Sequence, residues 1–412
     1  MPEDRDQTGE VQATIDEASR LGVPILLSAG RFRVGALTLR PGTRIIGAGR
    51  QTVLQFTGGA TFLAANDAPG LSLDGFTIDG DRLAMDAARA TALVSLADCA
   101  DLVLADLVVQ NGLMNGIGLS RCSGSVRDCT VTGMSEAGLL SLDGRGLEIA
   151  HNRIADCANN GLQVWRSTPG EDGTRIVANF IRQIGAKGGG SGQNGNGINV
   201  FRAGDVLIAN NRIADCAYTA IRGNAAANIQ MVGNSCARVG EVALYAEFAF
   251  EGALIANNIV RQAASGISVT NFNEGGRLAV VQGNLIRDLV RREQEPVDTR
   301  GIGIGIEADT AVSGNVIENA PTAGISAGWG PYLRDVAISG NLVRSAGIGI
   351  AISSNPGAGA CLVSNNMISG SRDGAIRTVA HGVAHGPDLA SADANAPAPH
   401  GGRLVLSGNV AV

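Results

Sequence analysis

Short stretches in which apolar and polar residues alternate recur along most of the chain. Examples are residues 162–165 (LQVW), 198–201 (INVF) and 267–270 (ISVT), in which the first and third side chains are apolar. A period of two is typical of β-strands that bury one face. Gly, Asn and Asp lie between the stretches, where corners of the chain need a positive φ. A helix is predicted only near the start, where residues 11–21 have apolar residues at helical spacing.

An asparagine recurs from about residue 150 onward and marks a repeat. Up to Asn366 the steps between successive copies are 27, 32, 23, 24, 26, 31, 26 and 25 residues. A nearly constant period with occasional longer steps predicts one structural turn per repeat, with insertions confined to particular corners. The copies are Asn152, Asn179, Asn211, Asn234, Asn258, Asn284, Asn315, Asn341, Asn366 and Asn409.

This repeat length fits leucine-rich repeats and parallel β-helices. The Leu-x-x-Leu-x-Leu frame of leucine-rich repeats is absent, whereas three short strands per turn, stacked about 4.8 Å apart, use about this many residues. The sequence therefore predicts an all-β fold, a right-handed parallel β-helix of roughly twelve or thirteen turns with an N-terminal helical cap. We interpret the asparagines as scaffold, because Asn tolerates a left-handed corner and its amide can bond to the Asn of the next turn.

The chain is expected to form one β-helix domain over residues 1–412. Residues 1–22 form the cap, 23–379 the coils, 380–402 an inserted loop and 403–412 the last strand. The inserted loop contains His381, His385, His400, Asp388 and Asp393. These side chains could bind a metal, but their Ala- and Pro-rich surroundings favour a loop, so no metal site is predicted.

Composition narrows the classes of function. The net charge of −6 argues against a nucleic-acid-binding surface, and no run of 18 apolar residues exists that would span a membrane. The seven cysteines are an odd number in a long chain and do not suggest a disulfide framework. Cys157 and Cys216 occur in identical Ile-Ala-Asp-Cys-Ala units and are expected to be inert core residues. No cofactor is predicted; Ca²⁺ is possible, but the sequence does not indicate it.

Several segments resemble known proteins. The start of the chain, with its helix followed by GRFRV (30–34) and GTRIIGAG (42–49), is similar to the start of many pectin-lyase-like β-helix proteins. Four further segments look like the twin-arginine-translocated repeat proteins of proteobacteria. These are VWRS (164–167), GQNGNGINVFRA (192–203), ALYAEF (243–248) and NFNEGGR (271–277).

The resemblance covers nearly the whole chain and implies a β-helix related to carbohydrate-active enzymes. It also implies export in folded form, so the protein is expected in the periplasm or outside the cell. The N-terminal residues contain no apolar signal core, and this expectation therefore requires a leader that has been removed. The family has no established substrate or catalytic residues, so the resemblance supplies no activity.

Strand alternation converts the repeat into a map of the surface. The apolar residue after each corner is taken to point inward, so the residues one and three positions later point outward. The aligned inward positions are Ile117, Leu139, Leu162, Ile198, Ile221, Leu244, Ile267, Ile304, Ile325 and Ile376. In the central turns the outward side chains are aromatic, amide or charged: Gln163, Trp165, Asn199, Phe201, Arg222, Asn224, Tyr245, Glu247 and Glu307. Arg166, Arg202, Asn271 and Trp329 follow at the edge of this stripe.

This composition suits a groove for an extended poly- or oligosaccharide. Sugar faces stack on aromatic rings, while hydroxyls hydrogen-bond to amides, carboxylates and Arg. The competing interpretation is a solvated strand face, which would normally carry Thr, Ser, Lys and Asp. The outward Leu140 and Leu142 indicate a surface that another molecule covers, so a homo-oligomer is possible.

Two mechanisms are consistent with the residues of the groove. We slightly favour β-elimination by a polysaccharide lyase. Elimination needs an Arg to neutralise a uronate, a base to take the α-proton and an acid for the leaving oxygen. Arg222 and Tyr245 occupy equivalent positions on neighbouring turns, so Tyr245 is a candidate base or acid. Arg202 or Arg166 would then pair with the uronate carboxylate.

Hydrolysis or glycosyl transfer, including fructosyl transfer, instead needs two carboxylates that flank the bond. Glu247 and Glu307 occupy the same position two turns apart, so about 9.5 Å along the axis. Glu251 could close a tighter pair with Glu247, and either carboxylate could simply form a salt bridge with Arg222. The sequence thus predicts an exported carbohydrate-active enzyme, with Glu247, Tyr245, Arg222 and Glu307 as catalytic candidates. A non-catalytic sugar-binding solenoid is the remaining alternative.

Overall fold

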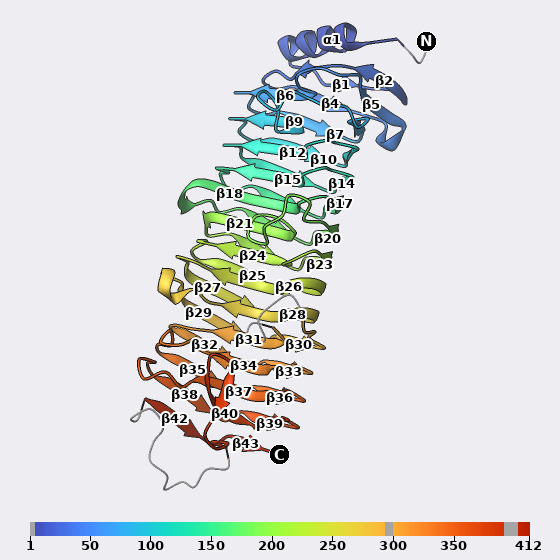
Figure 1. The fold of residues 1–412 in the computed structure, drawn as a ribbon. Coiled ribbons are helices and arrows are strands. Elements are labelled where there is room, and N and C mark those ends of the chain that lie inside the picture. The colour runs from blue at the N-terminus through green and yellow to red at the C-terminus, as the bar shows by residue number, and fades with distance from the viewer. Residues whose placement is uncertain (1–4, 293–299, 391–402) are drawn as a thin grey trace. The chain divides into compact units, whose positions relative to one another are not determined.

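The computed structural model describes residues 5–292, 300–390 and 403–412. They form a right-handed parallel β-helix of about 14 turns that follows one α-helix, which confirms the predicted fold class (Figure 1). The chain divides into two compact units, Met1–Leu207 and Ile208–Val412, and each is described by itself. The assignment of all 412 residues to one domain stays a prediction.

The helix α1 (Thr8–Leu21) begins the first unit and covers the first strands. It ends at Gly22, whose φ of 68° lets its backbone N–H bond back to the carbonyls of Ala18 and Ser19. The Gln12 side chain forms two hydrogen bonds with the backbone of Thr38, at 2.8 and 3.0 Å. Because the first turn has no preceding strand, these contacts satisfy backbone groups that would otherwise be unpaired. The helix is therefore compatible with the predicted cap.

Each turn of the first unit contributes three strands, which stack in register on those of the next turn. The first strands are β1 (Ile25–Leu26), β4 (Arg44–Ile46), β7 (Ser72–Asp74), β10 (Leu102–Ala105), β13 (Gly124–Arg127), β16 (Glu148–Ala150) and β19 (Arg175–Val177). The next first strand, β22 (Leu207–Ala209), contains the boundary between the two units. The second strands are β2 (Gly30–Val34), β5 (Thr52–Phe56), β8 (Thr77–Asp79), β11 (Val108–Gln110), β14 (Thr130–Thr132), β17 (Arg153–Cys157) and β20 (Phe180–Ile184). The third strands are β3 (Leu37–Thr38), β6 (Leu63–Asn66), β9 (Ala92–Ala97), β12 (Asn115–Ser120), β15 (Ala137–Leu142), β18 (Asn160–Glu171) and β21 (Asn196–Gly204). A short 3-10 helix, η1 (Gly49–Gln51), precedes β5.

The second unit repeats this arrangement, but in two turns the second and third strands merge into one long strand. The first strands are β25 (Ile229–Val232), β27 (Glu251–Ala256), β29 (Arg277–Gln282), β32 (Thr310–Ser313), β35 (Val336–Ser339), β38 (Cys361–Ser364) and β42 (Leu404–Ser407). The merged strands are β26 (Ser235–Glu247) and β28 (Ile259–Val269). The other second strands are β23 (Arg212–Cys216), β30 (Leu285–Arg287), β33 (Val316–Glu318), β36 (Leu342–Arg344), β39 (Met367–Ser369) and β43 (Val410–Ala411). The other third strands are β24 (Ile221–Asn224), β31 (Ile302–Ile306), β34 (Ala323–Ala327), β37 (Ile348–Ser353) and β40 (Ile376–Ala380). The 3-10 helix η2 (Phe272–Glu274) follows β28.

The inward alignment used for the surface map is confirmed within each unit. In the first unit Ile117, Leu139, Leu162 and Ile198 are register partners on successive turns. In the second unit the register runs through Ile221, Leu244, Ile267, Ile304, Ile325, Ile350 and Ile376. All of these side chains are at most 1% exposed. Ile350 belongs to this series although the predicted list of inward residues passes directly from Ile325 to Ile376.

The recurrent asparagines form the predicted ladder. In the second unit each side-chain amide donates to the next Asn Oδ1 at 2.9–3.1 Å, from Asn211 through to Asn409. In the first unit Asn152 donates to Asn179 at 3.0 Å. The left-handed conformation, however, belongs to the residue before each Asn, such as His151 with a φ of 59°. The Asn contributes its buried hydrogen bonds to the corner, not its tolerance of a positive φ.

Replacement of one ladder residue should therefore weaken the fold. Asn258 accepts two hydrogen bonds from Asn234 and donates to the Met231 carbonyl and to Asn284. Because Asn258→Ala leaves several of these buried groups without partners, we expect a loss of about 2–4 kcal/mol in the free energy of unfolding. Denaturant titration measures it, and the exposed Asn273→Ala is the control. Equal stability of the two variants would contradict the scaffold interpretation.

All seven cysteines are buried and free, as expected. Burial raises the pKa of the Cys157 thiol to about 12, so this side chain is unreactive at neutral pH. Burial raises the pKa of Cys216 as well.

The segment 380–402 contains more structure than the predicted loop. The strand β41 (Val383–His385) turns back and pairs antiparallel with β40. His381 and Gly382, both with positive φ, form the tight turn between the two strands. Asp388 accepts hydrogen bonds from the backbone of Ala375 and Ile376. His400 and Asp393 lie outside the described residues. The predicted last strand, 403–412, contains two short strands, β42 and β43.

Candidate functional site

The third strand of each turn carries the candidate residues, and its alternation is as predicted. In the first unit Gln163 pairs in register with Asn199, and Trp165 pairs with Phe201. The Trp165 and Phe201 rings meet edge to face, with centroids 6.2 Å apart, and both are partly exposed. Asn199 is only 2% exposed, because its amide donates to the Gly192 carbonyl of the glycine-rich corner at 3.1 Å. The aromatic pair is therefore more accessible than the two amides.

Arg202 and Arg166 flank this aromatic pair. The Arg202 guanidinium lies over the Phe201 ring, 4.6 Å from its centroid, and donates to the Ser167 carbonyl. Arg166 lines a separate depression formed by the second half of β18 and the corner after β15.

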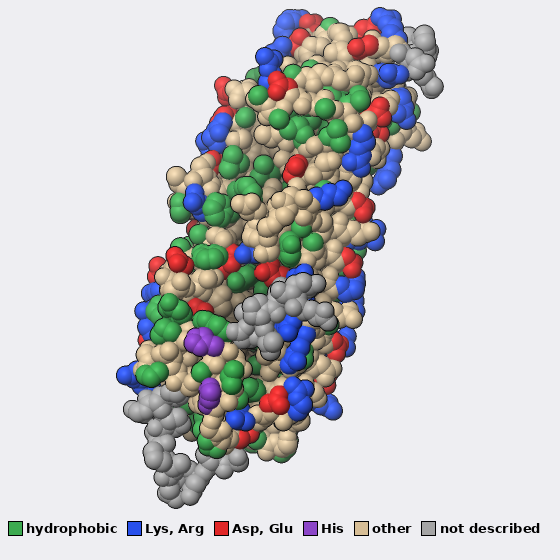
Figure 2. Space-filling model, in the orientation of Figure 1, with side chains coloured by type: hydrophobic (Ala, Val, Ile, Leu, Met, Phe, Trp, Pro, Cys, Tyr) green, Lys and Arg blue, Asp and Glu red, His purple; other side chains and the backbone are tan. Residues whose placement is uncertain are grey.

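Before Gln163, the outward face of the first unit is hollowed. Small side chains, among them Ser95 and Gly118, form this hollow together with Leu140 and Leu142, and its volume is about 470 Å³. Figure 2 shows hydrophobic side chains gathered over β12, β15 and β18. The expectation of a homo-oligomer stays a prediction.

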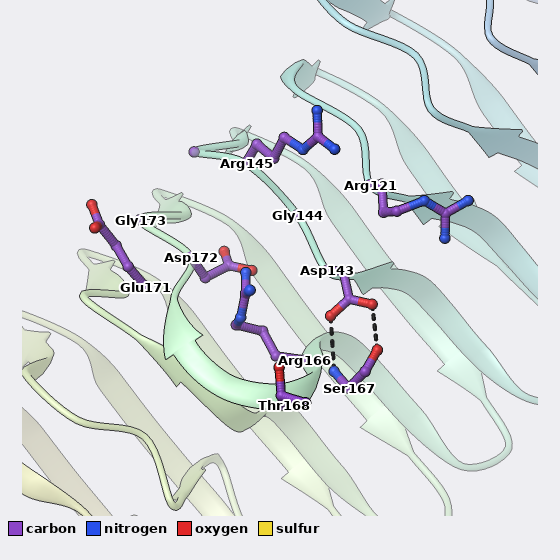
Figure 3. A pocket seen from close by; sticks show the side chains of 11 residues that line it. Arg121, Asp143, Gly144, Arg145, Arg166, Ser167, Thr168, Glu171, Asp172 and Gly173 are labelled. Carbon is purple, nitrogen blue, oxygen red and sulfur yellow. Dashed lines mark hydrogen bonds between the residues drawn. The ribbon is translucent and has the colours of Figure 1, made fainter.

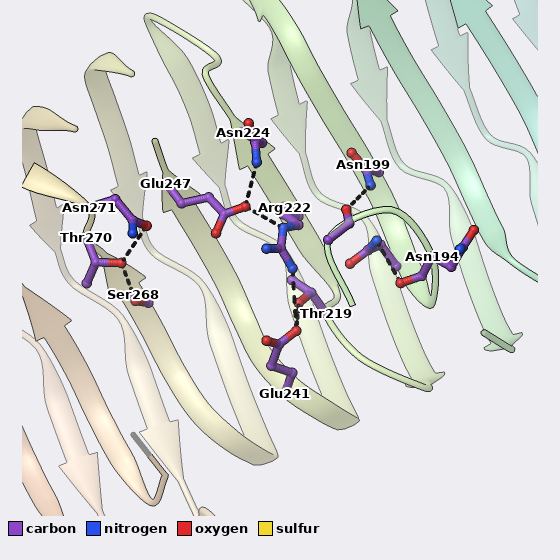
Figure 4. Close-up of polar contacts among 12 residues, drawn as sticks. Asn194, Asn199, Thr219, Arg222, Asn224, Glu241, Glu247, Ser268, Thr270 and Asn271 are labelled. Carbon is purple, nitrogen blue, oxygen red and sulfur yellow. Dashed lines mark hydrogen bonds and ion pairs between the residues drawn. The ribbon is translucent and has the colours of Figure 1, made fainter. Parts of the chain in front are cut away.

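The second unit holds a buried cluster of charged residues around Arg222 (Figure 4). Arg222 Nε donates to Glu247 Oε1 at 2.6 Å, and Asn224 donates to the same oxygen at 2.8 Å. The register explains this contact, because Arg222 pairs with Tyr245 and Asn224 with Glu247 on the adjacent turn. Glu247 is 1% exposed and Arg222 6% exposed. The predicted residues of these two turns are thus brought together, but as a tightly packed ion pair.

A further carboxylate of this cluster was not predicted. Glu241 lies 3.5 Å from Arg222 Nη1 and accepts a hydrogen bond from Thr219 at 3.2 Å. It lies in β26 at a register shift between Val239 and Val242, before the third-strand part. The surface map considered only positions one and three after each inward residue. A search of the corners for a carboxylate one turn from Arg222 would have found it.

Tyr245 packs against the same guanidinium. Arg222 Cζ lies 5.0 Å from the centroid of the Tyr245 ring. Burial, and then the charge of Glu247, raise the pKa of the Tyr245 hydroxyl above its usual value. A phenol with a raised pKa keeps its proton at neutral pH, so Tyr245 is suited to donate a hydrogen bond or proton and poorly suited to act as a base.

Glu307 lies two turns after Glu247 in the register. Ala246 pairs with Val269, and Val269 with Ile306, so Thr270 occupies the equivalent position on the turn between the two glutamates. Glu307 Oε2 accepts a hydrogen bond from the Phe272 backbone N–H at 2.7 Å. Asn271, which was predicted at the edge of the stripe, directly precedes the 3-10 helix η2 and has a φ of 69°. Glu307 is 8% exposed, and this burial raises the pKa of its carboxyl group.

The raised pKa of Glu307 predicts how stability depends on pH. The unfolded state loses this proton first, so stability falls as pH rises from the usual Glu pKa through the raised one, and then stays lower. Glu307→Gln removes the loss of stability that the buried negative charge causes at higher pH. We therefore expect the variant to have a higher Tm than the parent at about pH 7.5 and the same Tm at about pH 3.5. The control is Glu318→Gln, which removes a partly exposed carboxylate. A Tm gain at acidic pH would contradict the assignment.

Trp329 lies on the turn after Glu307, near a cavity of about 130 Å³. Its ring meets His381 edge to face, with centroids 5.1 Å apart. Ser326 and Ser353 line the same cavity. Glu251 does not close a pair with Glu247, because it lies on β27, is exposed and forms an ion pair with Arg277 at 3.1 Å.

No group of three or more His, Cys, Asp and Glu side chains in the described part of the chain could hold a metal ion. No helix among the same residues is long and apolar enough to cross a membrane.

The sequence matches a family described as the right handed beta helix region, over residues 92–274 and 174–332. Because these matches together span more than half of the chain, the protein belongs to the right-handed β-helix family. No protein with a curated description matches the sequence.

Solved structures share the fold at low sequence identity. An N-terminal fragment of bacteriophage phi29 gene product 12 is 15% identical with a TM-score of 0.52, covering 92% of this chain and 71% of that one. The DFA-IIIase from Arthrobacter chlorophenolicus A6, without its lid, is 14% identical with a TM-score of 0.51, covering 81% and 90%. The A-module of an Azotobacter vinelandii mannuronan C-5 epimerase is 14% identical with a TM-score of 0.42, covering 99% and 96%. These similarities concern the fold alone.

Proposed function

We propose that this protein is a carbohydrate-active enzyme that cleaves glycosidic bonds with Glu247 and Glu307. The observation that carries the proposal is that the two glutamates occupy the same outward position two turns apart, in different environments. Two turns correspond to about 9.5 Å along the axis. This value lies at the upper end of the range of about 6.5–9.5 Å found in inverting glycosidases, which leave room for a water molecule.

The surroundings of each carboxylate suit a different role. Glu247 accepts hydrogen bonds from Arg222 and Asn224, and a carboxylate oriented in this way suits a general base that activates water. Burial raises the pKa of Glu307, which suits a general acid that protonates the leaving oxygen. Two carboxyl groups whose environments differ in this way support acid–base roles in one reaction.

β-Elimination, which the sequence analysis slightly favours, receives less support from the geometry than hydrolysis or glycosyl transfer does. The Arg222 guanidinium already pairs with Glu247 and Glu241. These carboxylates partly neutralise its charge, so it is less able to neutralise a uronate. The raised pKa of Tyr245 opposes a role as the base. Hydrolysis or glycosyl transfer therefore fits these residues better than a lyase reaction does.

The proposed ligand is a poly- or oligosaccharide. In the first unit Trp165 and Phe201 form a partly exposed aromatic pair on which sugar rings can stack, and Gln163 and Asn199 lie beside it. That these residues and the glutamates of the second unit line one groove stays a prediction. The resemblance to twin-arginine-translocated repeat proteins supports a further proposal, that the protein acts in the periplasm or outside the cell.

One observation favours a second function, a non-catalytic sugar-binding solenoid. Glu247 is almost completely buried and paired, as expected for a structural salt bridge. A panel of neutral and uronate polysaccharides separates the candidates. New reducing ends without ultraviolet absorbance support the proposal, and an unsaturated, absorbing product would replace it with a lyase. Binding without either product would establish the solenoid.

A further inference from the structure

We infer that the first unit contains a second saccharide site, in the corner depression where β15 and β18 end, and that this site takes the hydroxyls of an uncharged sugar. The depression has a volume of about 770 Å³. Figure 3 shows Arg145, Arg166 and Asp172 around it. This site is independent of the proposed cleavage, because none of its residues belongs to the Glu247–Glu307 pair.

Two polar atoms at this depression, one acceptor and one donor, are buried without a hydrogen-bond partner. Asp172 is only 4% exposed, and its Oδ2 is buried without a hydrogen-bond partner. The other oxygen accepts the Thr174 backbone N–H at 3.2 Å. Arg166 Nε is likewise buried without a partner, and its guanidinium packs over Gly170. A buried acceptor and a buried donor left without partners are costly, and a polar ligand that bonds to both would remove this cost.

The charges around the depression favour an uncharged ligand. Three arginines and three carboxylates line it, and Arg121 is bound at 2.6 and 2.7 Å by both oxygens of Asp98. Asp143 is satisfied by the backbone N–H and the hydroxyl of Ser167. What remains is a mixed set: donors on Arg145 and Arg166, and acceptors on Asp172 and Glu171.

Sugar hydroxyls match such a mixed set, because each hydroxyl both donates and accepts. One hydroxyl of a vicinal pair would donate to Asp172 Oδ2, and its neighbour would accept from Arg166. A carboxylate ligand would satisfy the arginines, but it would place a second negative charge next to Asp172. Burial raises the pKa of Asp172, with hydrogen bonds from Thr174 and the charge of Arg166 partly opposing it. Affinity should therefore fall as the solution is acidified through this pKa, because a neutral carboxyl group accepts a hydrogen bond more weakly than a carboxylate does.

The experiment measures binding of cellotriose, maltotriose, inulotriose and trigalacturonate to the full chain by saturation-transfer NMR and calorimetry. We expect at least one neutral trisaccharide to bind, and Asp172→Asn and Arg166→Gln each to weaken it 10-fold or more. The control Arg175→Gln removes an exposed arginine that lies near Glu148 instead, and it should bind as the parent does.

Each remaining outcome overturns a defined part of the inference. Binding of trigalacturonate alone would show that the ligand is an acidic sugar and not a neutral one. If none of the four trisaccharides binds, the inferred site is wrong. Neutral binding that survives both substitutions would place the sugar elsewhere. Thermal melts of both variants exclude unfolding as the cause of a loss. Glu307→Gln should leave this binding unchanged even if it abolishes cleavage, so the failure of one proposal is distinguishable from that of the other.

Discussion

Glu247→Gln is expected to lower turnover by about 10²–10⁴-fold, the usual contribution of a positioned general acid or base. Gln keeps the shape of the side chain and an oxygen that can accept from Arg222 and Asn224, so the packing of β24 against β26 should persist. The rate falls because the amide cannot take a proton from the attacking water. Turnover is measured as reducing ends released from the polysaccharide that the parent protein cleaves.

The matched control is Glu251→Gln, which changes an exposed glutamate four residues later in the chain. It should have the activity of the parent. If Glu247→Gln instead lowers Tm and costs little activity, Glu247 is a structural ion-pair partner and the paired-carboxylate mechanism fails. If Tyr245→Phe is the damaging change and Glu247→Gln is mild, the lyase mechanism gains support.

Arg222→Met is expected to destabilise the protein by about 3–5 kcal/mol, because it leaves a buried carboxylate without its cation. Glu247 is 1% exposed, and Glu241 has only 20% of its side chain exposed. Two negative charges would then share a poorly solvated site. Denaturant titration at neutral pH measures the loss.

Arg238→Met provides a close comparison in the same unit. Arg238 binds both oxygens of Asp215 at 2.6 and 2.8 Å, but this pair is about 40% exposed. Exposed pairs contribute about 0–1 kcal/mol, so this variant should lose little stability. Addition of Glu247→Gln to Arg222→Met should restore part of the loss, because the buried charge is removed. Equal losses for the two arginine variants would show that the Arg222 site is effectively solvated.

The third-strand alignment shows how much of the fold was predictable. Inward residues such as Leu244 and Ile267 repeat at every turn, and a strand buries every second side chain, so the pattern leaves one consistent register. The Asn ladder was predictable for the same reason, since a stacked repeat brings equal positions into contact. The turn of Ile350 escaped because its neighbours Gly349 and Ala351 make the local alternation weak.

The residues of the candidate site could be predicted from the sequence, but their burial and their ion pairs could not. Arg222, Asn224, Tyr245 and Glu247 were assigned to neighbouring outward positions, and the register places them there. Their burial was not predicted, because an outward position on one strand does not reveal what covers it. Glu241 was missed because a register shift in β26 brings a corner residue within reach of Arg222.

Local alternation and a constant repeat length are enough to predict the β-helix, its register and the residues that share one face. The pairing of polar groups, in contrast, depends on tertiary contacts. The partners of Arg222 are Glu247 and Glu241, 25 and 19 positions away along the chain, and their distances depend on the stacking of turns. Burial of Glu307 and Asp172 likewise depends on corners packed over the strands. Charge, pKa and reactivity arise from these long-range contacts, which no local pattern encodes.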